Sequence, residues 1–180
     1  MKVALKPLFL PHPAQSARWL AHALALTLTC TLAAAQQPAA PQTATIQPFE
    51  PDSLQTIAQT QGDKPYWLIL WDLDCVYCMK SMQNLAALQK TQPELNIITI
   101  TTDSIDESEA LQQRLQSIGL KSSNYAFGSA SNQALRFAID PAWRGEKPRA
   151  YYYAPGQARR MLVGVLDAAR VLDAARVLAK

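Results

Sequence analysis

Two cysteines that follow a run of bulky apolar residues constrain this chain more than any other feature. Residues 66–71 read Tyr-Trp-Leu-Ile-Leu-Trp, an uncharged run typical of a buried strand. Cys75 and Cys78 follow it, at the start of a helical pattern that runs from Val76 to about Lys90. Two sulfurs at this spacing can close a small disulfide ring, and the start of a helix stabilises a thiolate through its free N–H groups and its dipole. The pattern indicates redox chemistry at residues 75–78.

Segments with strand and helix patterns alternate along the rest of the chain. The strand at 124–127 is expected at a sheet edge, and the turn at residues 155–157 predicts a hairpin between the last two strands. Strands alternating with helices, then a hairpin and a final helix, indicate a three-layer α/β domain with a mixed sheet. Helices are predicted at 53–60, 76–90, 106–118, 131–139 and from about 166 onward, and strands at 66–71, 95–102, 124–127, 149–154 and 158–165.

Residues 1–35 have the features of a secretory signal peptide. Lys2, Lys6 and Arg18 precede an uncharged apolar run that ends at Ala33-Ala-Ala35, a small-x-small cleavage site. An uncleaved membrane anchor is the alternative, although the run is short for a span and contains His22. The expected location is therefore the periplasm.

The segment after the predicted signal differs in composition from the domain that follows. Residues 36–49 are rich in Pro, Ala, Gln and Thr, which is typical of a flexible spacer. Residues 50–180 are then the predicted folded domain. Of the 17 Lys and Arg residues three precede Ala35, which leaves 14 against 14 Asp and Glu. This balance offers no basic surface for nucleic acid, so we expect no nucleic-acid partner.

The positions of histidine and cysteine exclude several kinds of site. Both histidines, His12 and His22, lie in the predicted signal, so Cys–His nucleophilic catalysis and His-based metal sites are excluded. Cys30 also lies there, which leaves only Cys75 and Cys78. Two thiolates cannot complete a structural zinc site. We expect neither a metal nor a cofactor.

These residues resemble the thioredoxin-like superfamily, and within it the exported TlpA/ResA-type thiol–disulfide oxidoreductases. The match lies in the strand before Cys75-x-x-Cys78, the β-α order that follows, and Pro148 just before a late strand. The resemblance implies a three-layer α/β/α sandwich with a central mixed sheet, and a cis-proline at Pro148 against the dithiol. It implies cofactor-free disulfide exchange with cysteines of other exported proteins. A membrane electron donor or acceptor is a further candidate partner.

Three positions depart from that family and leave the direction of electron flow open. Asp74 stands where Trp is usual, Ser81 where ResA-type reductases carry Glu, and Ile69 where thioredoxin has a buried Asp. The run Asp72-x-x-Cys75-x-Tyr77-Cys78 is similar to that of DsbC/DsbG-type isomerases. We predict a TlpA-like reductase; an oxidase or isomerase, or a binding module with a structural disulfide, are the alternatives. An isomerase would need a dimerisation domain, for which residues 36–180 leave no room, so a monomer is expected.

The resemblance also suggests roles around the dithiol. Cys75 is expected to be the exposed nucleophile and Cys78 the buried thiol that resolves the mixed disulfide. Pro148 would present the backbone of Lys147 to a substrate chain, with the Lys147 side chain simply exposed. Tyr77 would gate access to the dithiol or lie over it as a surface aromatic.

Two carboxylates beside the motif have two interpretations. Asp74 and Asp72 would raise the pKa of the Cys75 thiol and favour a reducing poise. Alternatively, Asp74 caps the helix, which is the interpretation we favour. Further along, residues 165–170 and 171–176 are identical copies of Val-Leu-Asp-Ala-Ala-Arg, and we expect this duplication to lengthen the final helix.

Overall fold

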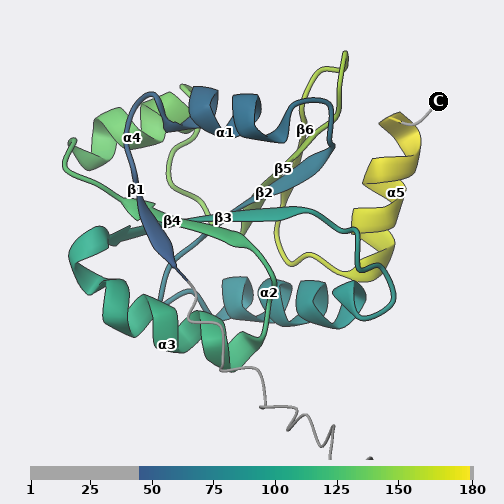
Figure 1. Cartoon of the computed structure of the whole chain (residues 1–180), viewed down its shortest axis with the longest axis horizontal. Coiled ribbons are helices and arrows are strands. Elements are labelled where there is room, and N and C mark those ends of the chain that lie inside the picture. Colours follow the sequence, from purple (N-terminus) through teal and green to yellow (C-terminus); the bar gives the residue numbers. More distant parts are fainter. Residues whose placement is uncertain (1–44, 179–180) are drawn as a thin grey trace, which may run out of the picture. The chain divides into compact units, whose positions relative to one another are not determined.

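The computed structural model describes residues 45–178, which form one mixed sheet covered by helices on both faces (Figure 1). The sheet has six strands in the order β1-β4-β3-β2-β5-β6. The four strands β1, β4, β3 and β2 are parallel, and β5 and β6 are antiparallel to their neighbours. The strands are β1 (Ile46–Phe49), β2 (Tyr66–Trp71), β3 (Ile97–Ser104), β4 (Ser123–Phe127), β5 (Arg149–Tyr153) and β6 (Arg160–Val163).

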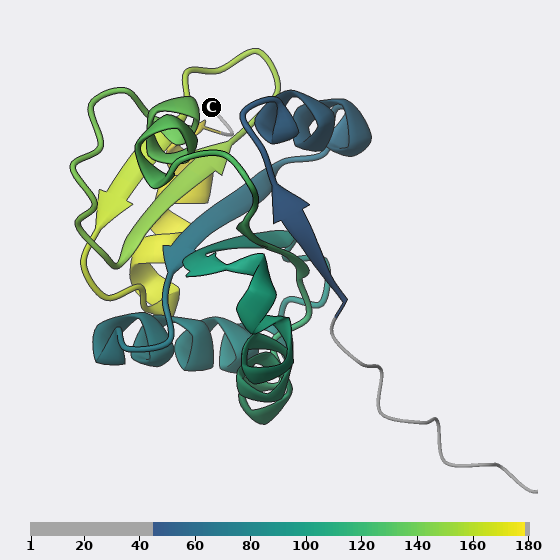
Figure 2. The same ribbon diagram turned by 90° about the vertical axis from the view of Figure 1, so that its left-hand side faces the viewer.

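The helices divide between the two faces of the sheet, as Figures 1 and 2 show. One face is covered by α1 and α4, and the other by α2 and α3, with α5 packed beside α2. The helices are α1 (Ser53–Gln61), α2 (Val76–Gln89), the short 3-10 turn η1 (Ile105–Glu107), α3 (Ser108–Ile118), α4 (Asn132–Ile139) and α5 (Ala168–Leu178). The predicted three layers with a central mixed sheet are confirmed.

Strand β2 lies at the centre of the sheet, and its side chains supply both layers of the core. Trp67, Ile69 and Trp71 belong to the cluster under α2, α3 and α5, whereas Leu68 and Leu70 belong to the cluster under α1 and α4. This alternation follows from the two-residue repeat of a strand. All six residues are buried because helices cover both faces, which explains why the run has no polar positions.

Two sequence-based assignments at the edge of the sheet are wrong. Residues 46–49, included in the predicted spacer, form β1 and pair with β4. As a result β4 is an interior strand between β1 and β3, not an edge strand. Residues 46–49 are only four long, contain Pro48, and have two exposed positions in the middle, so they carry little hydrophobic signal. A proline is tolerated there because β1 is an edge strand. The predicted signal peptide lies outside the described residues.

The two identical hexapeptides take different structures. Within the first copy, Asp167 accepts a hydrogen bond from the backbone N–H of Arg170 at 2.9 Å, and Leu166 is buried before the helix starts. The second copy lies wholly inside α5, where Val171 and Ala174 are buried. The duplication therefore supplies both the start of the last helix and most of its length. None of the helices within residues 45–178 is long and apolar enough to span a membrane.

Candidate redox site

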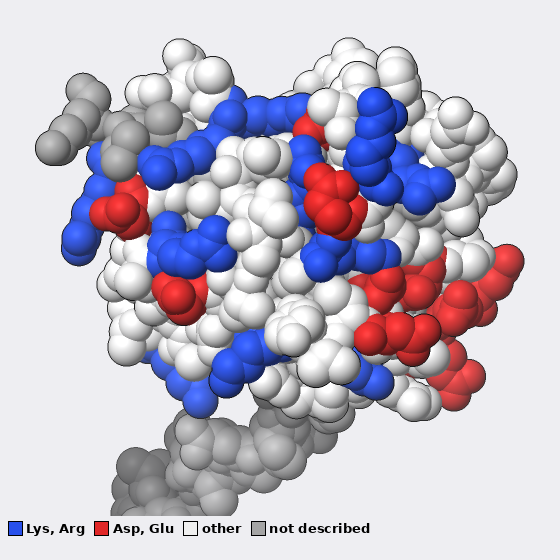
Figure 3. Space-filling model, turned by 180° about the vertical axis from the view of Figure 1, so that it is seen from behind, with Lys and Arg blue, Asp and Glu red and all other residues white. Residues whose placement is uncertain are grey.

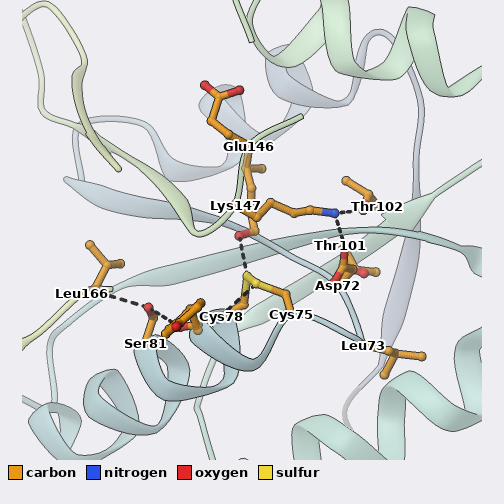
Figure 4. Close-up of a disulfide and its surroundings, with 12 residues drawn as sticks. Asp72, Leu73, Cys75, Cys78, Ser81, Thr101, Thr102, Glu146, Lys147 and Leu166 are labelled. Carbon is orange, nitrogen blue, oxygen red and sulfur yellow. Dashed lines mark hydrogen bonds and ion pairs between the residues drawn. A yellow bond between two sulfur atoms is a disulfide. The ribbon is translucent and has the colours of Figure 1, made fainter. Parts of the chain in front are cut away.

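The two cysteines form a disulfide at the first turn of α2 (Figure 4). Their Cα atoms are 5.1 Å apart. Cys75 is the N-cap residue of α2, and its sulfur accepts a hydrogen bond from the backbone N–H of Cys78 at 3.1 Å. Cys75 is partly exposed, whereas Cys78 is 0% exposed. An incoming sulfur can therefore reach Cys75 and not Cys78.

The position of Cys75 corrects the interpretation of Asp74 as the helix cap. A cap residue has non-helical backbone angles and places an acceptor near the N–H groups of the first turn, and Cys75 meets both conditions. Asp74 lies one residue earlier and is exposed. It forms no ion pair with another described residue. Its carboxylate therefore acts on the disulfide only as a nearby, solvated charge.

The loop that carries Cys75 is tied to the end of β3. The backbone N–H of Leu73 donates to Asp103 Oδ2 at 2.9 Å, and Thr101 Oγ1 donates to the same oxygen at 2.6 Å. The backbone N–H of Cys75 in turn donates to the carbonyl of Asp72 at 3.3 Å. Because the carboxyl ends of the parallel strands β2 and β3 meet at one edge, one carboxylate can hold the loop in place.

Lys147 is paired rather than freely exposed, which corrects the sequence-based interpretation. Its ammonium forms an ion pair with Asp72 and donates to Thr102 Oγ1 at 2.7 Å (Figure 4). The side chains of Lys147 and Asp72 are 17% and 21% exposed. A cation is thus held at the ends of β2 and β3, paired with a carboxylate that stands three residues before Cys75 along the chain. It offsets the charge of Asp72, which leaves Asp74 as the unpaired carboxylate beside the disulfide.

Pro148 is buried between Lys147 and the start of β5, and the peptide bond that precedes it is cis. Strand β5 runs antiparallel to β2, with Leu70 opposite Arg149. The proline therefore lies beside the end of β2, the strand that leads to Cys75. Its carbonyl accepts a hydrogen bond from the backbone N–H of Gly164 at 2.9 Å, which joins the loop to the end of β6.

A buried charged cluster lies on the other side of the proline. Arg149, 5% exposed, donates to Asp140 Oδ2 at 2.9 Å and to Tyr151 Oη at 2.6 Å, and forms an ion pair with Glu146. Tyr151 also donates to Asp140 Oδ2, at 2.7 Å. Arg159 reaches the other oxygen of Asp140 at 3.2 Å. The cluster joins the end of α4 to β5 and anchors the loop 140–148.

The cluster shifts the pKa values of its members. Burial acts to raise the pKa of Asp140, but hydrogen bonds from Tyr151, the N–H of Ala142 and Arg149, with the charge of Arg159, outweigh it and lower the pKa to about 2. Burial raises the pKa of the Tyr151 phenol, and its hydrogen bond to Asp140 raises it further. Asp140 is therefore ionised and Tyr151 neutral throughout the ordinary pH range.

The aromatic residues near the motif and in the core differ in exposure. Tyr77 and Val76 are 67% and 76% exposed and form an apolar surface beside the disulfide. Trp67 and Trp71 are core residues, as predicted for the buried strand 66–71, and Trp143 is a core residue as well. Trp143 Nε1 donates to the carbonyl of Glu146 at 2.9 Å. The indole nitrogens of Trp67 and Trp71 have no partner among the described residues.

Thr102 and Asp103 shape this site although the sequence did not point to them, and Ser81 stood out only as a departure from the family. Thr102 and Asp103 hold Lys147 and the loop before Cys75. Buried Ser81 accepts from the backbone N–H of Leu166 at 3.1 Å and donates to the carbonyl of Tyr77 at 2.9 Å, so it joins α2 to the segment before α5. The sequence signal for Thr102 and Asp103 was the run of polar residues at the carboxyl end of β3. It could not be tied to the site from sequence alone, because β3 lies next to the loop after β2 only once the strands pair.

Comparison with known proteins supports the fold independently. No family model and no curated protein matches the sequence. Solved structures do match. A thioredoxin-related protein from Neisseria meningitidis serogroup B aligns over 66% of this chain and 87% of its own, with a TM-score of 0.56 and 17% identity. A thioredoxin-family thiol:disulfide interchange protein from Chlorobium tepidum aligns over 67% and 83%, with a TM-score of 0.53 and 15% identity.

A third similar structure is the thioredoxin domain of a thiol-disulfide oxidoreductase from Bacteroides vulgatus. It aligns over 68% of this chain and 84% of its own, with a TM-score of 0.51 and 10% identity. At sequence identities this low, the structural similarity establishes the fold alone. The activities named in these descriptions are those of the neighbours. The described residues share with these neighbours a mixed sheet between helices, and a cysteine pair begins α2. The chain has the thioredoxin-like fold.

Proposed function

We propose that this protein is an exported thiol–disulfide oxidoreductase that exchanges disulfides with cysteines of partner proteins through Cys75 and Cys78. The observation that carries the proposal is the asymmetry of the pair: one sulfur is accessible at the helix cap, and the other is fully buried behind it. A disulfide across so short a loop stabilises the fold little through chain entropy. The thioredoxin-like neighbours, which include named oxidoreductases, and the signal-like residues 1–35 support the proposal.

The exchange proceeds through a mixed disulfide. In the reduced protein, the Cys75 thiolate attacks one sulfur of a partner disulfide, and the other partner sulfur leaves as a thiolate. Cys78 then loses its proton to solvent and attacks Cys75 Sγ, which releases the second partner sulfur. The partner gains two electrons and two protons, and the protein returns to the observed disulfide. A dithiol donor restores the reduced protein by attack at Cys75, since Cys78 is buried.

The first turn of α2 stabilises the attacking thiolate in this cycle. The N–H of Cys78 already points at the Cys75 sulfur, and the helix dipole adds positive charge. The opposing influence is Asp74, whose exposed carboxylate disfavours a thiolate. Because Lys147 offsets Asp72, Asp74 tips the balance modestly toward the disulfide. This arrangement favours the role of a reductant.

Insulin disulfide reduction tests the activity. Wild-type protein with dithiothreitol should accelerate insulin precipitation, whereas Cys75→Ser should act no faster than dithiothreitol alone. Cys78→Ala should retain the first step and accumulate mixed disulfides that disappear on reduction. A wild-type protein without activity, or a Cys75→Ser variant with full activity, contradicts the proposal.

The direction of exchange needs a separate measurement, equilibration of the Cys75–Cys78 pair with glutathione or dithiothreitol. A potential near that of thioredoxin, about −270 mV, fits a reductant, and one near about −120 mV fits an oxidant. A disulfide that resists dithiothreitol would instead indicate a structural bond in a binding module.

A further inference from the structure

Two hollows lie on the α4 side of the loop that contains Pro148, and they share one arginine. The inner hollow has a volume of about 120 Å³ and is lined by Thr102, Phe127, Asn132, Arg136, Gly145 and Lys147. The outer hollow has a volume of about 280 Å³ and is lined by Gln133, Arg136, Phe137, Pro141, Trp143 and Arg144. The inner hollow reaches Lys147, which contacts the loop before Cys75. Because Arg136 lines both hollows, they form one surface beside α4 that has Lys147 at its inner end.

Arg136 is held in place between the two hollows. Its Nε donates to the carbonyl of Asn132 at 3.2 Å. Gly145 has a φ of +100°, and a Cβ at this position would lie 3.3 Å from Arg136 Nη1. A side chain there would be strained and would crowd the guanidinium. The glycine thus leaves room for the guanidinium of Arg136, which lines both hollows.

The positive charge of this surface is not balanced within the described residues. Neither Arg136 nor Arg144 forms an ion pair with another described residue, whereas the cations that anchor the loop all do. The loop 140–148, its ion-pair partners and Arg136 of α4 together carry five cations and three carboxylates, so two positive charges remain. These residues are Arg136, Arg144, Lys147, Arg149 and Arg159 on one side, and Asp72, Asp140 and Glu146 on the other.

Negatively charged residues cluster at another place near the carboxyl ends of the parallel strands. Asp103, Asp106, Glu107 and Glu109 lie within seven positions at the end of β3 and the start of α3. Figure 3 shows one face on which acidic side chains form a group at the right-hand edge, apart from basic side chains above them. A negatively charged partner segment would be repelled from the start of α3 and attracted to α4.

The surface also contains an apolar contact. Phe137 is 65% exposed and lines the outer hollow with buried Trp143. An aromatic ring flanked by two unpaired guanidinium groups suits a segment in which carboxylates stand beside an apolar side chain.

We propose that the two hollows bind an acidic, extended segment of the partner protein and thereby direct its cysteine to Cys75. This inference rests on the proposed function and adds to it the kind of partner. Arg136 faces a carboxylate in the inner hollow, Arg144 faces a second one in the outer hollow, and Phe137 packs against an apolar side chain between them.

Two synthetic peptides test the inference. Each has one cysteine in a mixed disulfide with 2-nitro-5-thiobenzoate; one carries Asp residues around a Leu near the cysteine, and the other carries Ser in their place. The second-order rate of thiobenzoate release by reduced protein is measured by absorbance. Wild type should prefer the acidic peptide by about fivefold or more at low salt, and the preference should fall toward one as salt shortens the screening length to about 3 Å near 1 M.

Variants locate the preference on the surface. Arg136→Gln/Arg144→Gln should bring the ratio of the two rates near one, and Arg136→Glu/Arg144→Glu should reverse it. Lys64→Glu/Lys121→Glu has the same charge change as Arg136→Glu/Arg144→Glu, but at exposed positions near the amino ends of β2 and β4. This control variant should keep the wild-type ratio of the two rates. Thermal unfolding checks that every variant is folded.

The outcomes separate this inference from the proposed function. If wild-type protein releases thiobenzoate from neither peptide, the proposed function fails. If it reacts with both at equal rates, or if the Lys64/Lys121 variant loses the preference as much as the Arg136/Arg144 variant, only the docking inference is overturned. Equal rates together with co-sedimentation on phosphatidylglycerol vesicles that Arg136→Glu/Arg144→Glu abolishes would assign the surface to a membrane instead.

Discussion

Lys147 and Arg149 stand on either side of Pro148, and each pairs with an aspartate, but their surroundings differ. Lys147 and Asp72 are 17% and 21% exposed and lie at the end of β2, near the disulfide. The side chains of Arg149 and Asp140 are 6% and 10% exposed, and the carboxylate has Tyr151 and Arg159 as further partners. A partly solvated pair contributes little to folding, whereas breaking a buried pair leaves a charge without compensation.

This difference assigns two roles to one short loop. The Arg149 cluster fixes the loop to α4 and β5, so changes there act on stability. The Lys147 pair sets the charge next to Cys75, so changes there act on the chemistry of the disulfide. The distinction would be wrong if substitutions at the Lys147 pair changed mainly the stability, or if substitutions at the Arg149 cluster changed mainly the reduction potential.

The largest expected effect is on stability, at Arg149. Arg149→Met leaves Asp140 and Tyr151 buried with fewer partners, and we expect a loss of about 3 kcal/mol in the free energy of unfolding. Urea denaturation at pH 7 measures it. Lys147→Met is the matched comparison and should lose less than about 1 kcal/mol. Equal losses of unfolding free energy in the two variants would show that the different burial of the two ion pairs does not make their contributions to stability different.

The next effect is a dependence of stability on pH that comes from Asp140. Its pKa is about 2 in the folded protein and 3.8 for an unperturbed aspartate. Because the folded pKa is the lower one, the contribution is complete above about pH 4 and is lost as the pH falls toward 2. It amounts to about 2 kcal/mol. Urea denaturation at pH 5 and pH 2.5 should show a smaller fall for Asp140→Asn than for wild type, and an identical fall would contradict the assignment.

Substitutions at the Lys147 pair should shift the reduction potential in opposite directions. Asp72→Asn leaves Lys147 unopposed, which stabilises the Cys75 thiolate and raises the potential. Lys147→Met leaves the carboxylate unopposed and lowers it. Each shift should be at most about 20 mV, equivalent to about 1 kcal/mol for two electrons. Equilibration with a glutathione buffer measures both, and shifts of the same sign would exclude an electrostatic cause.

The smallest expected effect is at Asp74, whose carboxylate is exposed and unpaired among the described residues. Asp74→Asn should raise the reduction potential by about 5 to 10 mV, because it removes one solvated negative charge beside the thiolate. The shift should shrink in about 1 M salt, where exposed charges are screened. A salt-independent shift would point to a direct hydrogen bond in place of a solvated charge.

Much of the fold and the chemistry of the site follow from local patterns in the sequence. The uncharged run 66–71 and the helical pattern after Cys75 predict β2 and α2, since hydrophobic periodicity is a local property. β1 could not be predicted, because residues 46–49 become a strand only by pairing with β4. The two copies of Val-Leu-Asp-Ala-Ala-Arg show the same limit: identical residues form a helix start in one place and a helix interior in the other.

The sequence by itself determined the cysteine pair, its place at the start of a helix, and the absence of histidine from residues 36–180. Those features depend on neighbours along the chain. Only the tertiary structure decided that Cys75 is the cap and that Lys147 is paired with Asp72, 75 positions away. It also decided that Arg136 and Arg144 line hollows beside the loop that carries Lys147. The charges around the dithiol come from separate strands and loops, so only their pairing in the folded sheet determines which remain free to meet a partner.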